Sequence, residues 1–362
     1  MQLRGVDRMR KLLEKITKTK LFLPFFCLLL VLLINLFKSP SFFRVSVSNG
    51  VLYGRIIDIL NRGSEIAILA VGQTLAVAVS CGTDISVGSV MSLSACFTCM
   101  LLAGFGVHST TVLQMPMLIG IVAGILMGGL CGAFNGVLVS KLKIQPMIAT
   151  LILFVAGPAI GLLLCNNQMV YIRYDQYKYL GNFLNIGDWK CPIPTPILVT
   201  VLVVAVIAII LRKTSLGLYV QSVGINRRAS RLLGINSDKI VFICYVIAGL
   251  CAGVAGVVAS SRIYSADPNN IGLHFELDSI LAVTLGGNSL SGGKFSLTGS
   301  IIGAYTIQAI NTTLLAMGVS TDQAPVIKAV IVITIVAIQA PVFKQWWAGM
   351  KNRRQAEAKE LS

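Results

Sequence analysis

Apolar segments of about 20 residues recur along this chain, separated by short polar or basic stretches. About ten of them lie near residues 21–37, 65–81, 86–106, 114–139, 146–165, 196–211, 240–260, 276–290, 296–316 and 325–343. A helix of about 20 apolar residues is long enough to cross the hydrocarbon core of a bilayer. Only 12% of the residues are charged, compared with roughly 25% in soluble domains. The sequence therefore predicts an all-α integral membrane protein with about ten transmembrane helices, or eight or nine if some polar breaks are re-entrant.

The basic residues cluster outside the apolar segments. The net charge is +16, which would suit a nucleic-acid-binding protein. Its distribution instead follows the positive-inside pattern of membrane proteins, so we expect no nucleic acid and place both termini in the cytoplasm. The predicted organisation is a basic amphipathic segment (1–20) against membrane lipid, a transmembrane domain (21–343) with a basic cytoplasmic loop (212–239), and a basic tail (344–362).

Two polar breaks interrupt the apolar segments, one near Asp84 and one at Gly287–Gly293. A lone carboxylate in a membrane-spanning region is costly unless it faces protein or a water-filled cavity. The breaks thus predict discontinuous helices beside a translocation path. The alternative for the first break is a short cytoplasmic turn in which Asp84 caps the next helix. The candidate path residues are Gln73, Asp84, Ser86, Asn135, Asn288 and Ser289.

The chain lacks a recognisable catalytic constellation. Cys96 and Cys99 have zinc-like spacing but no second ligand pair, and His108 and His274 stand alone. Residues Gly287–Phe295 do not match a P-loop. A P-loop has four residues between its first glycine and the Gly-Lys pair, whereas five residues separate Gly287 from Gly293-Lys294. We therefore predict a transport subunit that is not an enzyme and holds no metal or cofactor of its own.

Residues 217–236 predict a short capped helix within the basic loop. Asn226 can cap its start, and Gly234 can end it in the left-handed conformation. A helix of about seven residues is unstable in isolation, so lipid headgroups or a partner groove must hold it. Its candidate contact residues, apolar on one side and basic on another, are Gly224, Asn226, Arg227, Arg228, Ala229, Arg231, Leu232, Leu233 and Gly234.

Four segments resemble, in the same order, motifs of the permease subunits of ribose/monosaccharide-type ABC importers. Gly82–Gly88 is similar to the motif G-G-I-D-L-S-V-G, and Gln145–Leu151 to P-P-F-I-A-T-L. Gly224–Ile235 resembles the family's coupling loop. Glu276–Asp278 with Leu285–Gly293 resembles E-L-D followed by L-G-G-T-S-L-x-G-G. The resemblance covers about residues 60–340. The chain departs from the family pattern at Cys81, Asn288 and Lys294-Phe295.

The resemblance implies a multi-pass subunit of a bacterial inner-membrane importer. A cytosolic ATP-binding-cassette ATPase would seat the coupling loop and hydrolyse ATP. A solute-binding protein outside the membrane would deliver a ribose- or galactose-like sugar. A second permease subunit, identical or paralogous, would complete the complex. The alternatives are another small polar solute (a nucleoside, a signalling furanoside or a branched-chain amino acid), or an ion-coupled secondary transporter that uses Asp84.

Overall fold

The computed structural model describes residues 22–38, 40–48, 50–186, 189–320 and 322–339. The predicted amphipathic segment (1–20) and basic tail (344–362) lie outside these residues. The chain divides into two compact units, Met1–Ala309 and Ile310–Ser362. The boundary falls within helix α13 (Leu297–Ala316), and the second unit contains α14 (Ala324–Gln339).

Helices dominate the first unit, as the sequence predicts. The long ones are α2 (Phe22–Lys38), α3 (Arg55–Ser80), α4 (Val87–Ala103), α5 (Met117–Ser140), α6 (Pro146–Leu164), α8 (Thr195–Lys213) and α11 (Ser237–Ile263). The described residues contain 5 helices that are long and apolar enough to cross a membrane: α3, α5, α6, α8 and α11. The fold class is confirmed, whereas the count of about ten spans stays a prediction.

Two predicted spans differ from the structure. Helix α3 begins at Arg55 rather than at residue 65, so its 26 residues comfortably exceed the length of a span. The predicted span 276–290 is α12 (Phe275–Leu285), which has 11 residues. At 1.5 Å per residue it is about 16 Å long, roughly half the thickness of the hydrocarbon core, so it cannot be a span. The prediction was too long because it included residues 286–290, which belong to the turn after α12.

Close contact between α5 and α11 forms the centre of the first unit. A Cβ atom on Gly249 would lie 2.3 Å from the carbonyl oxygen of Gly128 on the neighbouring helix. Each helix has another glycine about one turn further on, Gly132 in α5 and Gly253 in α11. Small residues at such spacing let two helix backbones approach within a membrane, where packing rather than the hydrophobic effect drives association.

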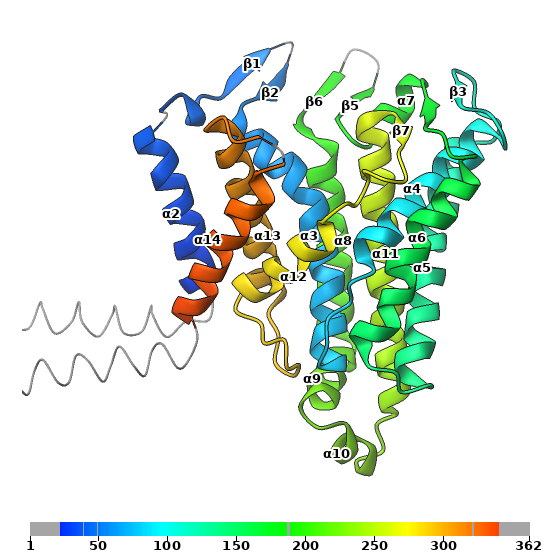
Figure 1. Cartoon of the computed structure of the whole chain (residues 1–362), viewed down its shortest axis with the longest axis vertical. Helices are drawn as coiled ribbons and strands as arrows, with labels where there is room; N and C mark the ends of the chain where they lie inside the picture. The colour runs from blue at the N-terminus through cyan, green and yellow to red at the C-terminus, as the bar shows by residue number, and fades with distance from the viewer. Residues whose placement is uncertain (1–21, 39, 49, 187–188, 321, 340–362) are drawn as a thin grey trace, which may run out of the picture. The chain divides into compact units, whose positions relative to one another are not determined.

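Short strands gather at one end of the first unit, and α9 (Leu216–Ile225) and α10 (Arg227–Leu232) lie at the opposite end (Figure 1). Antiparallel hairpins form from β1 (Ser46–Ser48) with β2 (Val51–Tyr53) and from β5 (Phe183–Ile186) with β6 (Trp189–Pro194). Strand β4 (Val170–Ile172) pairs in parallel with β3 (Ser109–Thr110) and antiparallel with β7 (Ser265–Ala266). We call these two ends the hairpin end and the α10 end.

A buried ion pair joins α3 to α11 near the hairpin end. The guanidinium of Arg262 lies 3.2 Å from Oε1 of Glu65, and the two side chains are 15% and 6% exposed. Arg262 also donates hydrogen bonds to the carbonyl and side-chain oxygens of Asn61. The pair therefore ties the end of α11 to the interior of α3.

Candidate functional site

The break between α3 and α4 holds Asp84 inside the protein. Helix α3 ends where Cys81 adopts a left-handed conformation (φ 56°), and α4 begins at Val87 after an irregular segment. Asp84 is 3% exposed, and its Oδ1 accepts hydrogen bonds from the backbone N–H (2.8 Å) and the hydroxyl (2.7 Å) of Ser86. The predicted helix interruption is therefore present. Asp84 is not in an exposed turn, although it does bond the N-cap residue of the following helix.

Two neighbouring helices bind the same irregular segment. Nδ2 of Asn135 on α5 donates to the Ser86 hydroxyl at 2.8 Å. The hydroxyl of Thr150 on α6 accepts from the backbone N–H of Ile85. Asn135, Ser86 and Asp84 thus form one chain of hydrogen bonds. These three predicted path residues are close together in the fold.

The other three predicted path residues lie apart from this chain of hydrogen bonds. Asn288 organises the turn between α12 and α13, since its Nδ2 donates to the Ser300 hydroxyl (2.8 Å) and its Oδ1 accepts from the Ser296 N–H. Ser289 is exposed in that turn. Gln73 is fully buried on α3, and neither of its amide atoms has a hydrogen-bond partner among the described residues. Their roles in translocation stay predictions.

A cavity of about 140 Å³ lies where α4 and α12 begin, and we call it the α4–α12 cavity. Residues Gly88 and Ser89 of α4, Phe154 of α6, and His274 and Glu276 at the start of α12 line it. None of them is among the predicted path residues. The available signal was an acidic pair, Glu276 and Asp278, within a predicted span, because ionisable residues in spans are costly and mark functional sites.

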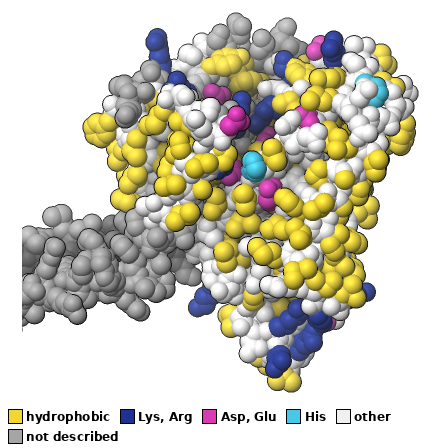
Figure 2. Space-filling view, viewed as in Figure 1, with side chains coloured by type: hydrophobic (Ala, Val, Ile, Leu, Met, Phe, Trp, Pro, Cys, Tyr) yellow, Lys and Arg dark blue, Asp and Glu magenta, His cyan; other side chains and the backbone are white. Residues whose placement is uncertain are grey.

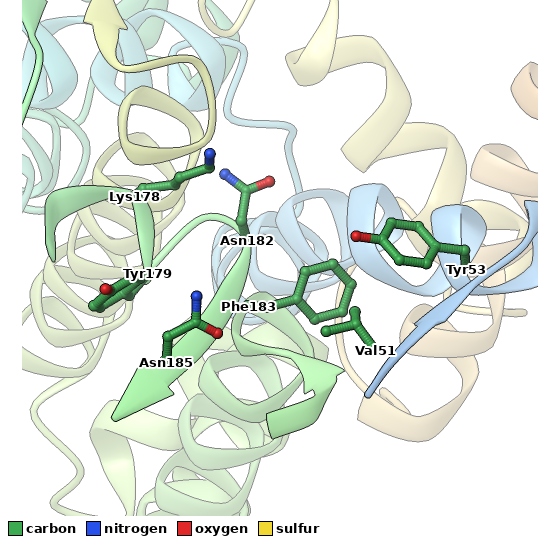
Figure 3. Close-up of a pocket in the computed structure, with 7 residues that line it drawn as sticks. All are labelled: Val51, Tyr53, Lys178, Tyr179, Asn182, Phe183 and Asn185. Carbon is green, nitrogen blue, oxygen red and sulfur yellow. The ribbon is translucent and has the colours of Figure 1, made fainter. Parts of the chain in front are cut away.

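A second cavity, of about 190 Å³, opens at the hairpin end. Figure 3 shows Tyr53 and Val51 of β2 facing Phe183, with Lys178 and Asn182 on the other side. The rings of Tyr53 and Phe183 lie 5.8 Å apart between centroids. Oδ1 of Asn185 is buried without a hydrogen-bond partner among the described residues. The pocket lies between the β1–β2 and β5–β6 hairpins, which come from distant parts of the chain.

The α10 end carries the predicted capped helix. The side chain of Asn226 accepts hydrogen bonds from the backbone N–H groups of Arg228 and Ala229, both at 3.0 Å, and Gly234 has a φ of 82°. Both predicted helix signals are therefore confirmed. The sequence did not predict α9, because its 10 residues include two glycines and show no clear apolar face.

Apolar side chains project from α10 into solvent. Leu232 is 90% exposed and Leu233 is 79% exposed, beside exposed Ala229. Figure 2 shows apolar and basic side chains together at this end of the molecule. Full burial of a leucine side chain contributes about 1.5–3 kcal/mol. Two adjacent exposed leucines therefore form an apolar surface that lipid headgroups or a partner would cover.

The predicted basic side of α10 divides into two parts. Arg227 and Arg231 each bond Oδ1 of Asp238, at 2.7 and 2.6 Å, and Lys143 bonds the same oxygen. Asp238 lies in the first turn of α11, so this cluster fastens α10 to a core helix and to the turn after α5. Arg228 is exposed and makes no ion pair with any other residue in the described part of the chain. Of the three arginines, only Arg228 forms no ion pair among the described residues, and the contact roles of all three stay predictions.

Gly224 of α9 lies against both helix breaks, just before α10 begins. A Cβ atom there would lie 1.9 Å from the carbonyl oxygen of Ala78, at the end of α3, and 2.6 Å from the backbone nitrogen of Gly293. The thiol of Cys81 donates to the carbonyl oxygen of Gly224, and the Gly293 N–H donates to Ala78. Glycine is required here because three backbone segments meet. Gly224, at the end of α9 and just before α10, therefore packs against both the end of α3 and the 287–293 turn.

Comparison with known proteins agrees with this architecture. The family model described as "Branched-chain amino acid transport system / permease component" matches residues 55–338. The galactofuranose transporter permease protein of Escherichia coli (strain K12) is 41% identical over 90% of this chain and 91% of its own length. The fructose import permease protein of Bifidobacterium longum (strain NCC 2705) is 34% identical over 92% of each chain. The ribose import permease protein of Escherichia coli (strain K12) is 34% identical over 83% of this chain and 87% of its own. No solved structure matches the chain. The chain therefore belongs to the branched-chain amino acid transport system permease family and is a membrane permease.

Proposed function

We propose that this chain is the membrane-spanning subunit of a bacterial ATP-binding-cassette importer for a monosaccharide. The support is that relatives matching almost the whole chain are named for galactofuranose, fructose and ribose. All three are small polyhydroxylated rings, so a monosaccharide fits better than a branched-chain amino acid. ATP is hydrolysed by a separate cytosolic subunit, and a solute-binding protein delivers the sugar from outside the membrane.

The distribution of charge supports one orientation. At the α10 end, Lys141, Lys143, Arg212, Lys213 and Arg228 are exposed or close to exposed loops. Basic residues of this kind remain on the cytoplasmic side during insertion. The α10 end therefore faces the cytosol and the hairpin end faces the solute-binding protein. Both termini lie in the cytoplasm in this proposal.

The exposed leucine pair of α10 is the observation that carries the proposal. Leu232 and Leu233 stand on a helix that Asn226 caps and Asp238 fastens, so the apolar surface is presented by a supported element. The Gly224 contacts behind it lead to both breaks in the transmembrane helices. If a groove on the ATPase holds these leucines, closure of the ATPase would move α10. The contacts of Gly224 would pass this movement to the helix breaks, and the solute path would open to the other side of the membrane. A second permease subunit supplies the other half of the complex.

The test is copurification of the ATPase with tagged permease. Leu232→Asp places a charge in the apolar contact, and loss of an interface anchor costs about 2 kcal/mol or more. We expect the variant to insert in the membrane but to lose the ATPase and ATP-dependent uptake together. Leu142→Asp makes the same change at a residue that is 61% exposed at the same end but off α10, and it should retain the ATPase. Normal ATPase retention by Leu232→Asp would show that α10 is only a membrane-surface element.

A further inference from the structure

The α4–α12 cavity lies where the N-termini of α4 and α12 meet. Helix α4 has 17 residues and α12 has 11. Both begin at the cavity wall, with Gly88 and Ser89 in the first turn of α4 and Glu276 in the first turn of α12. The first backbone N–H groups of a helix lack partners within it. Discontinuous helices with such ends near mid-membrane build solute sites in other transporters.

The cavity is placed between the two ends of the first unit. Figure 1 shows α12 between the level of the hairpins and the level of α10. Figure 2 shows histidine and acidic side chains in the middle of the same face, with apolar side chains above and below them. Next to the cavity, Asn269 and Asn270 are exposed as well. Polar groups at this depth are costly against lipid, so this face contacts water or protein.

The chemistry of the cavity suits hydroxyl groups. Glu276 is 6% exposed and makes no ion pair with any described residue. A Cβ atom at position 88 would lie only 2.4 Å from Oε2 of Glu276. The absence of a side chain on Gly88 therefore leaves room for the carboxylate. An ionised carboxylate only accepts hydrogen bonds, and hydroxyl groups donate them. Phe154 and Leu273 supply apolar surface on other sides. The volume equals that of roughly five water molecules at about 30 Å³ each, which suits a small ring.

We propose that the α4–α12 cavity binds the monosaccharide during its passage, with the Glu276 carboxylate accepting hydrogen bonds from sugar hydroxyls. This inference rests on the proposed function, because it takes the solute to be a sugar. The competing explanation is that Glu276 serves only to stabilise the start of α12, where a negative charge is favourable. The two differ in whether an added sugar occupies the cavity and in whether the sugar's hydroxyls matter.

Protection from a thiol reagent tests occupancy directly. His274→Cys places a thiol on the cavity wall, and Leu277→Cys places one on the same helix at a residue that is 53% exposed and outside the cavity lining. The purified permease–ATPase complex in lipid discs is labelled with a water-soluble thiol reagent, with ribose, fructose or galactofuranose at millimolar concentration. Wild-type labelling is subtracted. We expect at least one sugar to slow labelling at residue 274 threefold or more and to leave residue 277 unchanged. Absence of protection by every sugar, or equal protection at both positions, overturns the inference.

Uptake of modified sugars tests the hydrogen bond. Glu276→Ala should reduce uptake roughly ten- to a hundredfold, the size expected for one hydrogen bond to a charged group, and Glu276→Gln should lose less. Both should retain the ATPase during purification. A deoxy sugar that lacks the recognised hydroxyl should be transported poorly by the wild type, and Glu276→Ala should no longer distinguish it from the parent sugar.

The results separate this inference from the proposed function. If the wild-type complex takes up no sugar when ATP is supplied, the proposed function is wrong. If the wild type transports a sugar and both Glu276 variants transport it equally well, only the cavity assignment is wrong. If Glu276→Gln and Glu276→Ala both lose the ATPase and unfold at lower temperature, Glu276 only stabilises α12, and the cavity assignment is again overturned.

Discussion

Removing the cap of α10 should weaken binding of the ATPase by a calculable amount. The side chain of Asn226 accepts hydrogen bonds from two backbone N–H groups, and Asn226→Ala removes both. Loss of such a cap costs about 1 kcal/mol. Helix α10 has 6 residues, so it has little intrinsic stability to absorb this loss. If α10 must be helical in the complex, the dissociation constant for the ATPase should rise about fivefold, since 1.4 kcal/mol corresponds to tenfold.

The chain contains a matched control for this experiment. Asn236 caps α11 by accepting a hydrogen bond from the Lys239 N–H, and α11 has 27 residues packed in the core. Asn236→Ala should therefore leave the affinity for the ATPase near the wild-type value, and Asn226→Ser, which keeps a capping oxygen, should restore most of the affinity lost with alanine. The assay is titration of purified ATPase onto permease in lipid discs. Equal affinities for wild type and Asn226→Ala, or equal losses for the two alanine variants, would refute the role of α10.

Three further predictions concern stability and topology. Asp84→Leu leaves two hydrogen-bond donors of Ser86 without an acceptor and should lower the free energy of unfolding by about 2 kcal/mol or more. Asp84→Asn keeps an acceptor, so it should unfold in detergent at a higher temperature than the leucine variant; identical unfolding midpoints would contradict this. Arg262→Leu leaves the buried carboxylate of Glu65 without its partner and should lower the free energy of unfolding by about 3–5 kcal/mol. Adding Glu65→Gln should recover most of this stability; a double variant no more stable than Arg262→Leu would disprove the pairing. Gln176→Cys, at an exposed position at the hairpin end, should react with a membrane-impermeant thiol reagent outside intact spheroplasts; reaction only after lysis would reverse the proposed orientation.

Local signals in the sequence were enough to predict several features of the fold. Helix α10 is such a case, because an asparagine cap and a terminating glycine act on neighbouring backbone groups. The break at Asp84 is another, since a glycine-rich polar stretch between apolar segments interrupts a helix wherever it lies. Long apolar segments likewise predicted the membrane-spanning helices. In each case the determining interactions lie within a few residues of one another.

Features that depend on distant segments could not be predicted in the same way. Nothing near Gly224 in the sequence indicates that Ala78 and Gly293 press against it. Asn288 lies in the second polar break, as Asp84 lies in the first, yet the side chain of Asn288 holds the turn after α12 through Ser296 and Ser300. Glu276 was overlooked because hydropathy assigns it to a span, whereas the short α12 places it at the wall of a cavity.

Uptake into proteoliposomes tests the central claim most directly. Vesicles containing the permease and its ATPase are loaded with ATP and given the solute-binding protein with a labelled monosaccharide outside. The account predicts accumulation of sugar that requires ATP hydrolysis, persists when a protonophore removes the proton gradient, and disappears with Leu232→Asp. Accumulation that continues with a non-hydrolysable ATP analogue and collapses with the protonophore would contradict the account and indicate an ion-coupled transporter.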